Sequence, residues 1–260
     1  MLRGLWSSAS GMQAQQLNID TISNNLANVN TPGFKRSQAT FQDLIYDKMR
    51  LPGSSSDSGN GIPSGLQIGL GVNVGTVKKI FTSGKPQQTG NQFDAWIEGN
   101  GFFQIRKADG TLAYTRDGSF NRSADGKLVT ADGYELDGLS AIDPQATSIG
   151  ISPNGRVSQT IGSTTSDVGQ ITLYNFVNPA GMLAEGHNLL LPSASSGTAQ
   201  AGTPGSNGFG TINQGYLEMS NVEVVQEMVN LIVAQRAYEV NTKAIQASDE
   251  MLQTANNIRR

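Results

Sequence analysis

The chain has 260 residues and a formal net charge of -3, and only 15% of its residues are charged. A chain of this length holds one large domain or two to three smaller ones. The sequence has no basic cluster, which excludes a nucleic-acid-binding protein because phosphates must be met by concentrated positive charge. The absence of cysteine excludes disulfides, thiolate metal sites and thiol catalysis.

The sequence contains no segment typical of membrane insertion. No apolar run approaches the roughly 18 residues that cross a bilayer. The N-terminus also lacks the apolar stretch of about 7 to 15 residues found in a secretory signal. We therefore expect no membrane span, and export without a cleaved signal peptide if the protein leaves the cytoplasm.

Residues 1–30 carry a heptad pattern, which predicts a helix that packs along another helix. The residues seven apart are Leu5, Met12, Ile19 and Leu26. This helix is intrinsically weak, because Gly4 and Gly11 each cost about 1 kcal/mol relative to Ala. We expect packing to supply the stability that propensity does not.

The first helix should end before Thr31, since the residue before a proline is disfavoured in the α region. Pro32 and Gly33 occupy the central positions of a predicted type II turn. We expect Phe34 to anchor the following segment, with Lys35 and Arg36 exposed.

Residues 31–65 are predicted to be an extended linker. Its second half, PGSSSDSGNGIPSG, is dominated by Gly and Ser and has almost no apolar residues. The pattern over 37–64 leaves open whether this part forms a helix, a hairpin or no regular structure.

Residues 66–219 change to short alternating or apolar runs, such as GFFQIR, LAYTR and QITLYNFV, which are typical of strands. Asp-Gly pairs mark tight turns between them. The pairs begin at Asp109, Asp117, Asp125, Asp132 and Asp137. Asn154 and Gly155 mark a further hairpin. The sequence therefore predicts an all-β, meander-rich domain.

Residues 220–260 predict a second, longer helix. Ser220 and Glu223 have the spacing of a capping box. One apolar row contains Val224, Leu231, Tyr238, Ile245 and Leu252. Met228 begins a more polar row that continues through Gln235, Thr242 and Asp249. An uninterrupted helix of this length would extend about 57 Å at about 1.5 Å per residue.

The two terminal helices are each other's best partners in the chain. The simplest arrangement is an antiparallel pair with both termini at one end. The predicted fold class is thus α+β, with a coiled-coil domain from residues 1–30 and 220–260 and a β domain inserted between them. The same heptads are equally compatible with two surface helices docked on a common core.

Chemistry typical of enzymes is missing from the sequence. The only histidine, His187, lies in a predicted loop. No nucleophile elbow, phosphate loop or His-Glu-x-x-His motif occurs. The Asp-Gly pairs do not have the ligand spacing of a calcium loop. We expect no catalytic residue, no metal and no cofactor.

Four motifs, in order along the chain, resemble those of bacterial flagellar axial proteins, the rod and hook subunits. They are NNLANVNTPGFKR, EGNGFFQI, YTRDGSF and SNVEVVQEMVNLIVAQRAYEVN. The first contains the residues that match the family motif: Asn24, Asn25, Leu26, Asn28, Asn30, Thr31, Pro32, Gly33 and Phe34. The chain length and the segment PSGLQIGLGV look most like those of distal rod subunits. Trp96 departs from the pattern, where a smaller aliphatic residue is expected.

The resemblance implies a structural subunit that polymerises into a hollow drive shaft, transmits torque from motor to hook and lets exported subunits pass. The implied location is the rod of the basal body, in the periplasmic space. The implied partners are further copies, proximal rod and hook subunits, the surrounding rings and the flagellar type III export apparatus. The assembly seam is predicted at Leu5, Met12, Ile19, Leu26, Val224, Met228, Leu231, Tyr238, Ile245 and Leu252.

Two alternatives remain open at this point. One is a self-contained β binding module on a helical-hairpin stalk. The other is a close relative within the same family, a proximal rod or hook subunit.

Overall fold

The computed structural model describes residues 2–50, 64–162, 164–206 and 208–258. The chain forms two compact units. Unit 1 contains Met1–Leu26, Ser37–Lys78 and Val224–Arg260, and unit 2 contains Ala27–Arg36 and Lys79–Glu223. Long helices lie at the two ends of the chain and the strands lie between them, so the predicted α+β class is confirmed.

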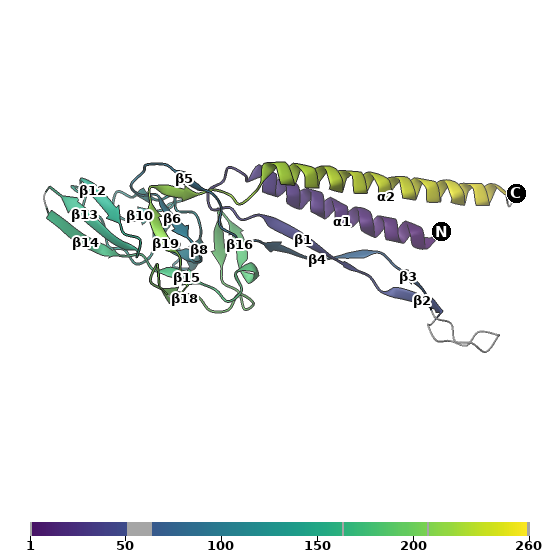
Figure 1. Cartoon of the computed structure of the whole chain (residues 1–260), viewed down its shortest axis with the longest axis horizontal. Helices are drawn as coiled ribbons and strands as arrows, with labels where there is room; N and C mark the ends of the chain where they lie inside the picture. The colour runs from purple at the N-terminus through teal and green to yellow at the C-terminus, as the bar shows by residue number, and fades with distance from the viewer. Residues whose placement is uncertain (1, 51–63, 163, 207, 259–260) are drawn as a thin grey trace. The chain divides into compact units, whose positions relative to one another are not determined.

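Unit 1 is built on two antiparallel helices, α1 (Leu2–Ala27) and α2 (Val224–Ile258). Asn25 near the end of α1 contacts Glu227 near the start of α2. Met12, which precedes Asn25 in α1, contacts Thr242, which follows Glu227 in α2. The two ends of the chain therefore lie at the same end of the pair, as Figure 1 shows. This confirms the predicted pairing of the terminal helices.

The second helix begins later than the capping-box pattern predicts. α2 starts at Val224, and the Ser220 hydroxyl accepts the N–H of Val222 at 3.3 Å. Asn221 keeps this segment out of the helix, because its side chain binds the backbone of Arg36 and Ile80. Ser220 is therefore not the helix cap.

The other part of unit 1 consists of strands. They are β1 (Ser37–Asp43), β2 (Tyr46–Arg50), β3 (Leu66–Gly69) and β4 (Val72–Lys79). β1 pairs with β4, and β2 pairs antiparallel with β3. The segment expected to be a linker thus contributes strands, and residues 66–78 belong with the helices rather than with the β domain. Residues 51–63 of the Gly/Ser-rich stretch lie outside the described residues.

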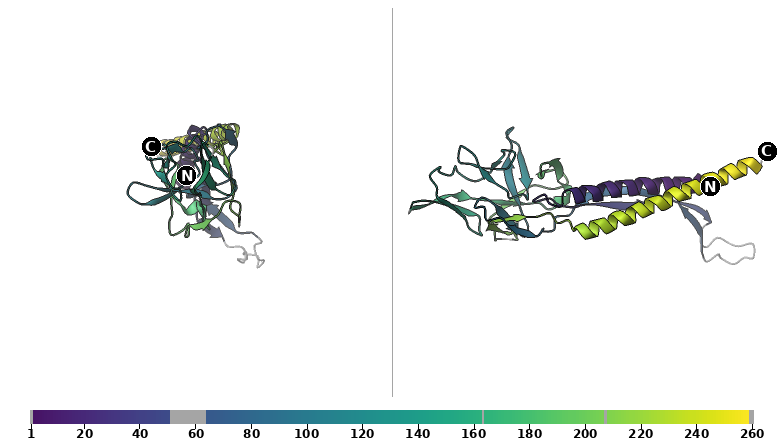
Figure 2. Two further views of the ribbon diagram at one scale, coloured as in Figure 1. Left: turned by 90° about the vertical axis from the view of Figure 1, so that its left-hand side faces the viewer. Right: turned by 90° about the horizontal axis from the view of Figure 1, so that it is seen from above.

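Helix α1 packs against these strands at both of its ends. The Ser10 hydroxyl accepts the N–H of Val72 at 3.3 Å. The Asn25 side chain pairs with both backbone groups of Ser37, each bond 2.8 Å long. Figure 2 shows α1 running alongside β1 and β4.

The regular secondary structure of unit 2 consists mainly of β strands. Its main sheet has nine strands, with the order β16-β17-β8-β7-β11-β10-β9 and with β15 joining β7 to β18. These strands are β7 (Phe102–Arg106), β8 (Leu112–Thr115), β9 (Asn121–Arg122), β10 (Leu128–Val129), β11 (Glu135–Leu136), β15 (Leu173–Asn175), β16 (Leu183–Gly186), β17 (Leu189–Leu191) and β18 (Gln200–Gly202). A short 3-10 helix, η1 (Pro179–Gly181), precedes β16.

Smaller sheets complete unit 2. One has the order β12-β13-β14, and the pairs β19-β6 and β20-β5 form two others. Their bounds are β5 (Pro86–Gln88), β6 (Ala95–Glu98), β12 (Ser148–Ile151), β13 (Arg156–Ile161), β14 (Thr164–Gln170), β19 (Thr211–Gln214) and β20 (Tyr216–Glu218). A hydrophobic core with the edge-to-face pair Phe103 and Phe120 at its centre joins these sheets.

Most of the predicted tight turns have the expected backbone. Gly110, Gly126, Gly133 and Gly138 have φ between 80° and 90°, and Gly155 in the β12–β13 hairpin has φ 79°. Gly118 is the exception among the Asp-Gly pairs, since its φ is not positive. It is required for space instead, because a Cβ there would lie 1.7 Å from the Ala95 carbonyl oxygen.

Candidate assembly surface

The face of α2 that packs on α1 is lined by small and polar residues. Glu227 and Ala234 are buried, and Asn241 and Ser248 continue the same heptad row at half-buried positions. The two helices approach closely here, since a Cβ at Gly11 would lie 3.0 Å from the Asn241 amide nitrogen. Little apolar side chain is buried along this row of the pair.

The opposite face of α2 carries apolar side chains that the described residues of the chain leave uncovered. Its residues are Val225, Val229, Ile232, Val233 and Val240, with exposed fractions between 49% and 77%. At about 100° per residue they form one stripe on the side away from Ala234. We call these five residues the outer apolar stripe. An apolar stripe on a helix normally packs against another surface.

The ten residues of the predicted seam divide by their exposure in the single chain. Val224, Met228 and Tyr238 are exposed. The other seven are half-buried: Leu5, Met12, Ile19, Leu26, Leu231, Ile245 and Leu252. The more polar row that starts at Met228 is not the inward row, which lies one position earlier at Glu227. As a seam between subunits, the set stays a prediction.

Sequence reasoning missed the outer apolar stripe, although a signal was present. The five residues recur at spacings of three, four and seven, which is the same helical periodicity that identified the first row. A search for a second apolar face on the same helix would have found them.

The strands of unit 1 add further exposed apolar side chains. On the strands they are Tyr46, Met49, Leu66 and Ile68, and Ile45, which is 80% exposed, lies between β1 and β2. Trp6 on α1 is also largely exposed. Exposed apolar surface of this extent is unusual on a protein that functions as a monomer and marks a site of protein contact.

The family motif after α1 forms a tightly packed turn in unit 2. The N–H of Phe34 is bonded to the carbonyl of Thr31 at 3.3 Å, and Gly33 has φ 69°, as the predicted type II turn requires. Phe34 is buried and Lys79 lies over its ring. The Pro32 carbonyl accepts a hydrogen bond from Asn188.

Lys35 is buried, so the expectation that it is exposed was wrong. Its ammonium is 2.5 Å from Glu218, which is itself buried together with Arg116. Burial lowers the pKa of Lys35, while the Glu218 carboxylate opposes this shift. Glu218 is distant in sequence, so no local pattern predicts the contact.

The amides of the motif have different roles. Asn25 is buried and bonded to Ser37 and Glu227. Asn28 is half-buried, and its side-chain oxygen accepts the Thr31 hydroxyl. Asn24 and Asn30 are exposed.

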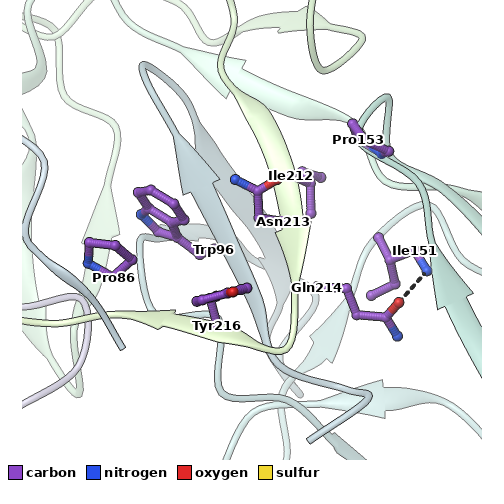
Figure 3. A pocket seen from close by; sticks show the side chains of 8 residues that line it. All are labelled: Pro86, Trp96, Ile151, Pro153, Ile212, Asn213, Gln214 and Tyr216. Atoms are coloured by element: carbon purple, nitrogen blue, oxygen red, sulfur yellow. Dashed lines mark hydrogen bonds between the residues drawn. The ribbon is translucent and has the colours of Figure 1, made fainter. Parts of the chain in front are cut away.

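A hollow of about 460 Å³ lies on unit 2, where β5, β6, β19 and β20 meet. Figure 3 shows Pro86, Trp96 and Tyr216 gathered along one side of it. The amide oxygen of Gln214 on the other side is already used by the N–H of Ile151, at 2.9 Å. The side chains that line the hollow include no carboxylate, ammonium, guanidinium or imidazole group.

Within the described residues, His, Asp and Glu side chains do not gather in groups of three or more that could hold a metal ion. Neither α1 nor α2, over the ranges given above, has the length and hydropathy that a membrane-spanning helix needs.

Comparisons with known families match three stretches that together cover more than half of the chain. "Flagella basal body rod protein" matches residues 5–35. "Flagellar hook protein FlgE/F/G D1 domain" matches residues 96–159, and "Flagellar basal body rod FlgEFG protein C-terminal" matches residues 213–258.

The chain is similar over its whole length to flagellar basal-body rod proteins FlgG. It is 49% identical to that of Borreliella burgdorferi and 42% identical to that of Bacillus subtilis, with 100% of each chain covered. Its similarity to the flagellar hook protein FlgE of Helicobacter mustelae, at 48% identity, covers 53% of this chain and 31% of the hook protein.

Proposed function

We propose that copies of this chain polymerise through their terminal helices into a helical tube. The premise is that the chain belongs to the family of flagellar basal-body rod proteins. The chain is a non-enzymatic structural subunit of the distal rod. That role replaces the alternatives of a self-contained binding module and of a hook subunit. The proposal concerns how the subunits join and what the joined rod does.

The observation that carries the proposal is the outer apolar stripe of α2. Its side chains lie opposite the side that α1 covers, and they are exposed among the residues that the structure describes. Fully burying one such side chain stabilises by about 1.5 to 3 kcal/mol. Burying five such side chains of one helix against a neighbouring copy would strongly stabilise the contact between the two copies.

Repetition of this contact would give an open polymer. A surface that meets a different surface of the next copy, with a screw rotation, continues indefinitely instead of closing into a ring of two. We expect the resulting tube to be hollow, with the helices toward its axis, so that exported subunits pass along it. The predicted seam residues would line these helix contacts.

The function of such a tube is to carry torque from the motor to the hook. This requires stiffness rather than chemistry. Stiffness follows from close-packed interfaces, because packed interiors have low compressibility. The buried aromatic core of unit 2 has that character.

We also propose the partners and the location of the rod. The ends of the tube would contact proximal rod and hook subunits, and its outside would face the surrounding basal-body rings in the periplasmic space. Export would proceed through the flagellar type III apparatus.

The proposal is tested by placing a charge in the outer apolar stripe. Ile232→Asp should abolish rod formation, since assembly would bury an unpaired carboxylate. Stability of the dilute monomer should be unchanged, because Ile232 is exposed there. Basal bodies from a strain that expresses the variant would be inspected by electron microscopy, and motility scored in soft agar.

The matched control is Gln246→Asp, which adds the same charge at another exposed position of α2. Rods should form with this variant. Normal rods with Ile232→Asp, or equal loss with both variants, would contradict the role of the stripe.

A further inference from the structure

Three segments of unit 2 connect it along the chain to unit 1. They are residues 27–36, residues 79–84 and residues 218–223, since the chain enters or leaves unit 1 next to each of them. Any force that passes along the backbone between the units must pass through these segments. Their hydrogen bonds converge on two side chains, Glu218 and Asn221.

Glu218 binds both of the other segments. It is 1% exposed, and its Oε1 accepts bonds from the Lys35 ammonium at 2.5 Å and from the Gly84 N–H at 2.8 Å. Its backbone carbonyl accepts the N–H of Gly33 at 2.7 Å. One residue of the third segment thus joins the first and the second.

Asn221 repeats the same connection three residues later. Its Oδ1 accepts the N–H of Arg36 at 2.8 Å. Its Nδ2 donates to the Ile80 carbonyl at 2.8 Å and to the Thr82 hydroxyl at 2.9 Å. Lys35 also donates to the Thr82 carbonyl at 2.9 Å, so the first and second segments are bonded directly as well.

Arg116 fastens this group to the sheet of β6. One of its terminal nitrogens lies 3.5 Å from Glu218, and the other donates to the Gly99 carbonyl at 2.7 Å. The approach of the segments is close: a Cβ at Gly84 would lie 1.8 Å from the Met219 carbonyl oxygen.

The choice of residues indicates a role other than stability alone. Two cations and one carboxylate are almost fully buried here, and burying charges costs more than burying apolar side chains of the same size. Removing one partner from a buried ion pair leaves an uncompensated buried charge, so displacing one of these groups alone is costly.

We propose that Lys35, Arg116, Glu218 and Asn221 form a junction clamp that binds the three connecting segments together. A force that reaches unit 2 through one segment is then shared by all three and by the β6 sheet. In a rod subunit this prevents one connection from yielding alone under torque. This use of the clamp rests on the proposed function; the coupling of the segments does not.

The coupling is tested by hydrogen exchange of the dilute full chain, followed by mass spectrometry. In Asn221→Ala, amides of all three segments should exchange at least about tenfold faster. In the natural protein the segments open only together, whereas in the variant each segment can open locally by itself. Peptides from β7 and β13 should keep their rates. Glu218→Gln should give the same pattern. If Glu218→Gln does not fold, because it removes a buried charge, Asn221→Ala still tests the proposal.

The matched control is Asn213→Ala, which removes an exposed amide bond to Glu98 elsewhere in unit 2. It should leave the three segments unchanged. Faster exchange of residues 218–223 alone, no change in any segment, or equal acceleration of β7 and β13 would overturn the clamp. Because the measurement uses monomers, it is independent of rod formation. Failure of the Ile232→Asp test would overturn the polymer proposal without affecting this result.

Discussion

Gly33 is a residue at which both backbone geometry and packing require glycine. It has φ 69°, and a Cβ there would lie 2.5 Å from the backbone nitrogen of Asp117. Gly33→Ala should therefore lower the free energy of unfolding by about 3 kcal/mol or more, from backbone strain and overpacking together. The measurement is urea denaturation followed by Trp96 fluorescence in a Trp6→Phe background.

Gly90→Ala is the control for this prediction. Gly90 has nearly the same φ, 72°, but a Cβ there meets nothing within 4 Å. Its cost should be only the backbone strain, about 1 kcal/mol. Equal costs at the two positions would mean that the contact with Asp117 has no energetic weight.

Asp117 should make stability depend on pH. Burial is the main cause that raises the pKa of its carboxyl above the ordinary value of 3.8. Between 3.8 and the raised pKa the folded state binds more protons than the unfolded state, so stability falls as pH rises through this window. Asp117→Asn removes this dependence.

Denaturation of both proteins at several pH values above 3.8 checks the sign. The free energy of unfolding of the natural protein, relative to Asp117→Asn, should decrease as pH rises. A constant difference, or an increase, would contradict burial of the carboxyl as the cause.

Lys35 illustrates what a sequence cannot disclose at the scale of a residue. The turn at Pro32 and Gly33 was predictable because its rules are local. A lysine after such a turn is normally exposed, and only the folded chain brings Glu218 and Arg116 to it. Contacts between residues this distant in sequence produce no periodic pattern in the sequence from which they could be predicted.

At the scale of elements, heptads predicted both helices and their antiparallel pairing. They did not predict which row faces inward. The row at Glu227 and Ala234 packs on α1 because close approach needs small side chains, whereas the larger apolar residues lie on other faces. Strands were predicted from residue 66 onward, but β1 and β2 were not, because β1 pairs with β4 across a Gly/Ser-rich stretch that has no strand pattern.

Asn25 connects α1 to β1, and its bonds need an amide. It donates to the Ser37 carbonyl and accepts the Ser37 N–H, as a paired strand would. Asn25→Asp cannot donate and places a carboxylate near Glu227, so it should lower the free energy of unfolding of unit 1 by about 1 to 3 kcal/mol.

Thermal unfolding followed by helical circular dichroism measures the effect of Asn25→Asp. Asn30→Asp is the control, since Asn30 is exposed and the same change there should cost little. An equal loss of stability in the two variants would contradict the role of the Asn25 bonds in holding β1.

At the scale of the whole molecule, composition and motif order predicted the α+β class and the inserted β domain. They also predicted that the chain is a structural protein rather than an enzyme. The distribution of apolar surface explains that role. Unit 2 buries its aromatic residues in a core, while unit 1 leaves much of its apolar surface uncovered on α2 and on its strands. A subunit of a polymer needs one stable body and one surface that neighbours complete.

The most direct measurement of this account uses the absence of cysteine, since a single substitution supplies the only thiol. Ile232→Cys would be reacted with a water-soluble maleimide, first in dilute monomer and then in isolated rods. The account predicts rapid labelling of the monomer and protection in the rod, because a neighbouring copy covers the outer apolar stripe. Equal labelling in both states would contradict it.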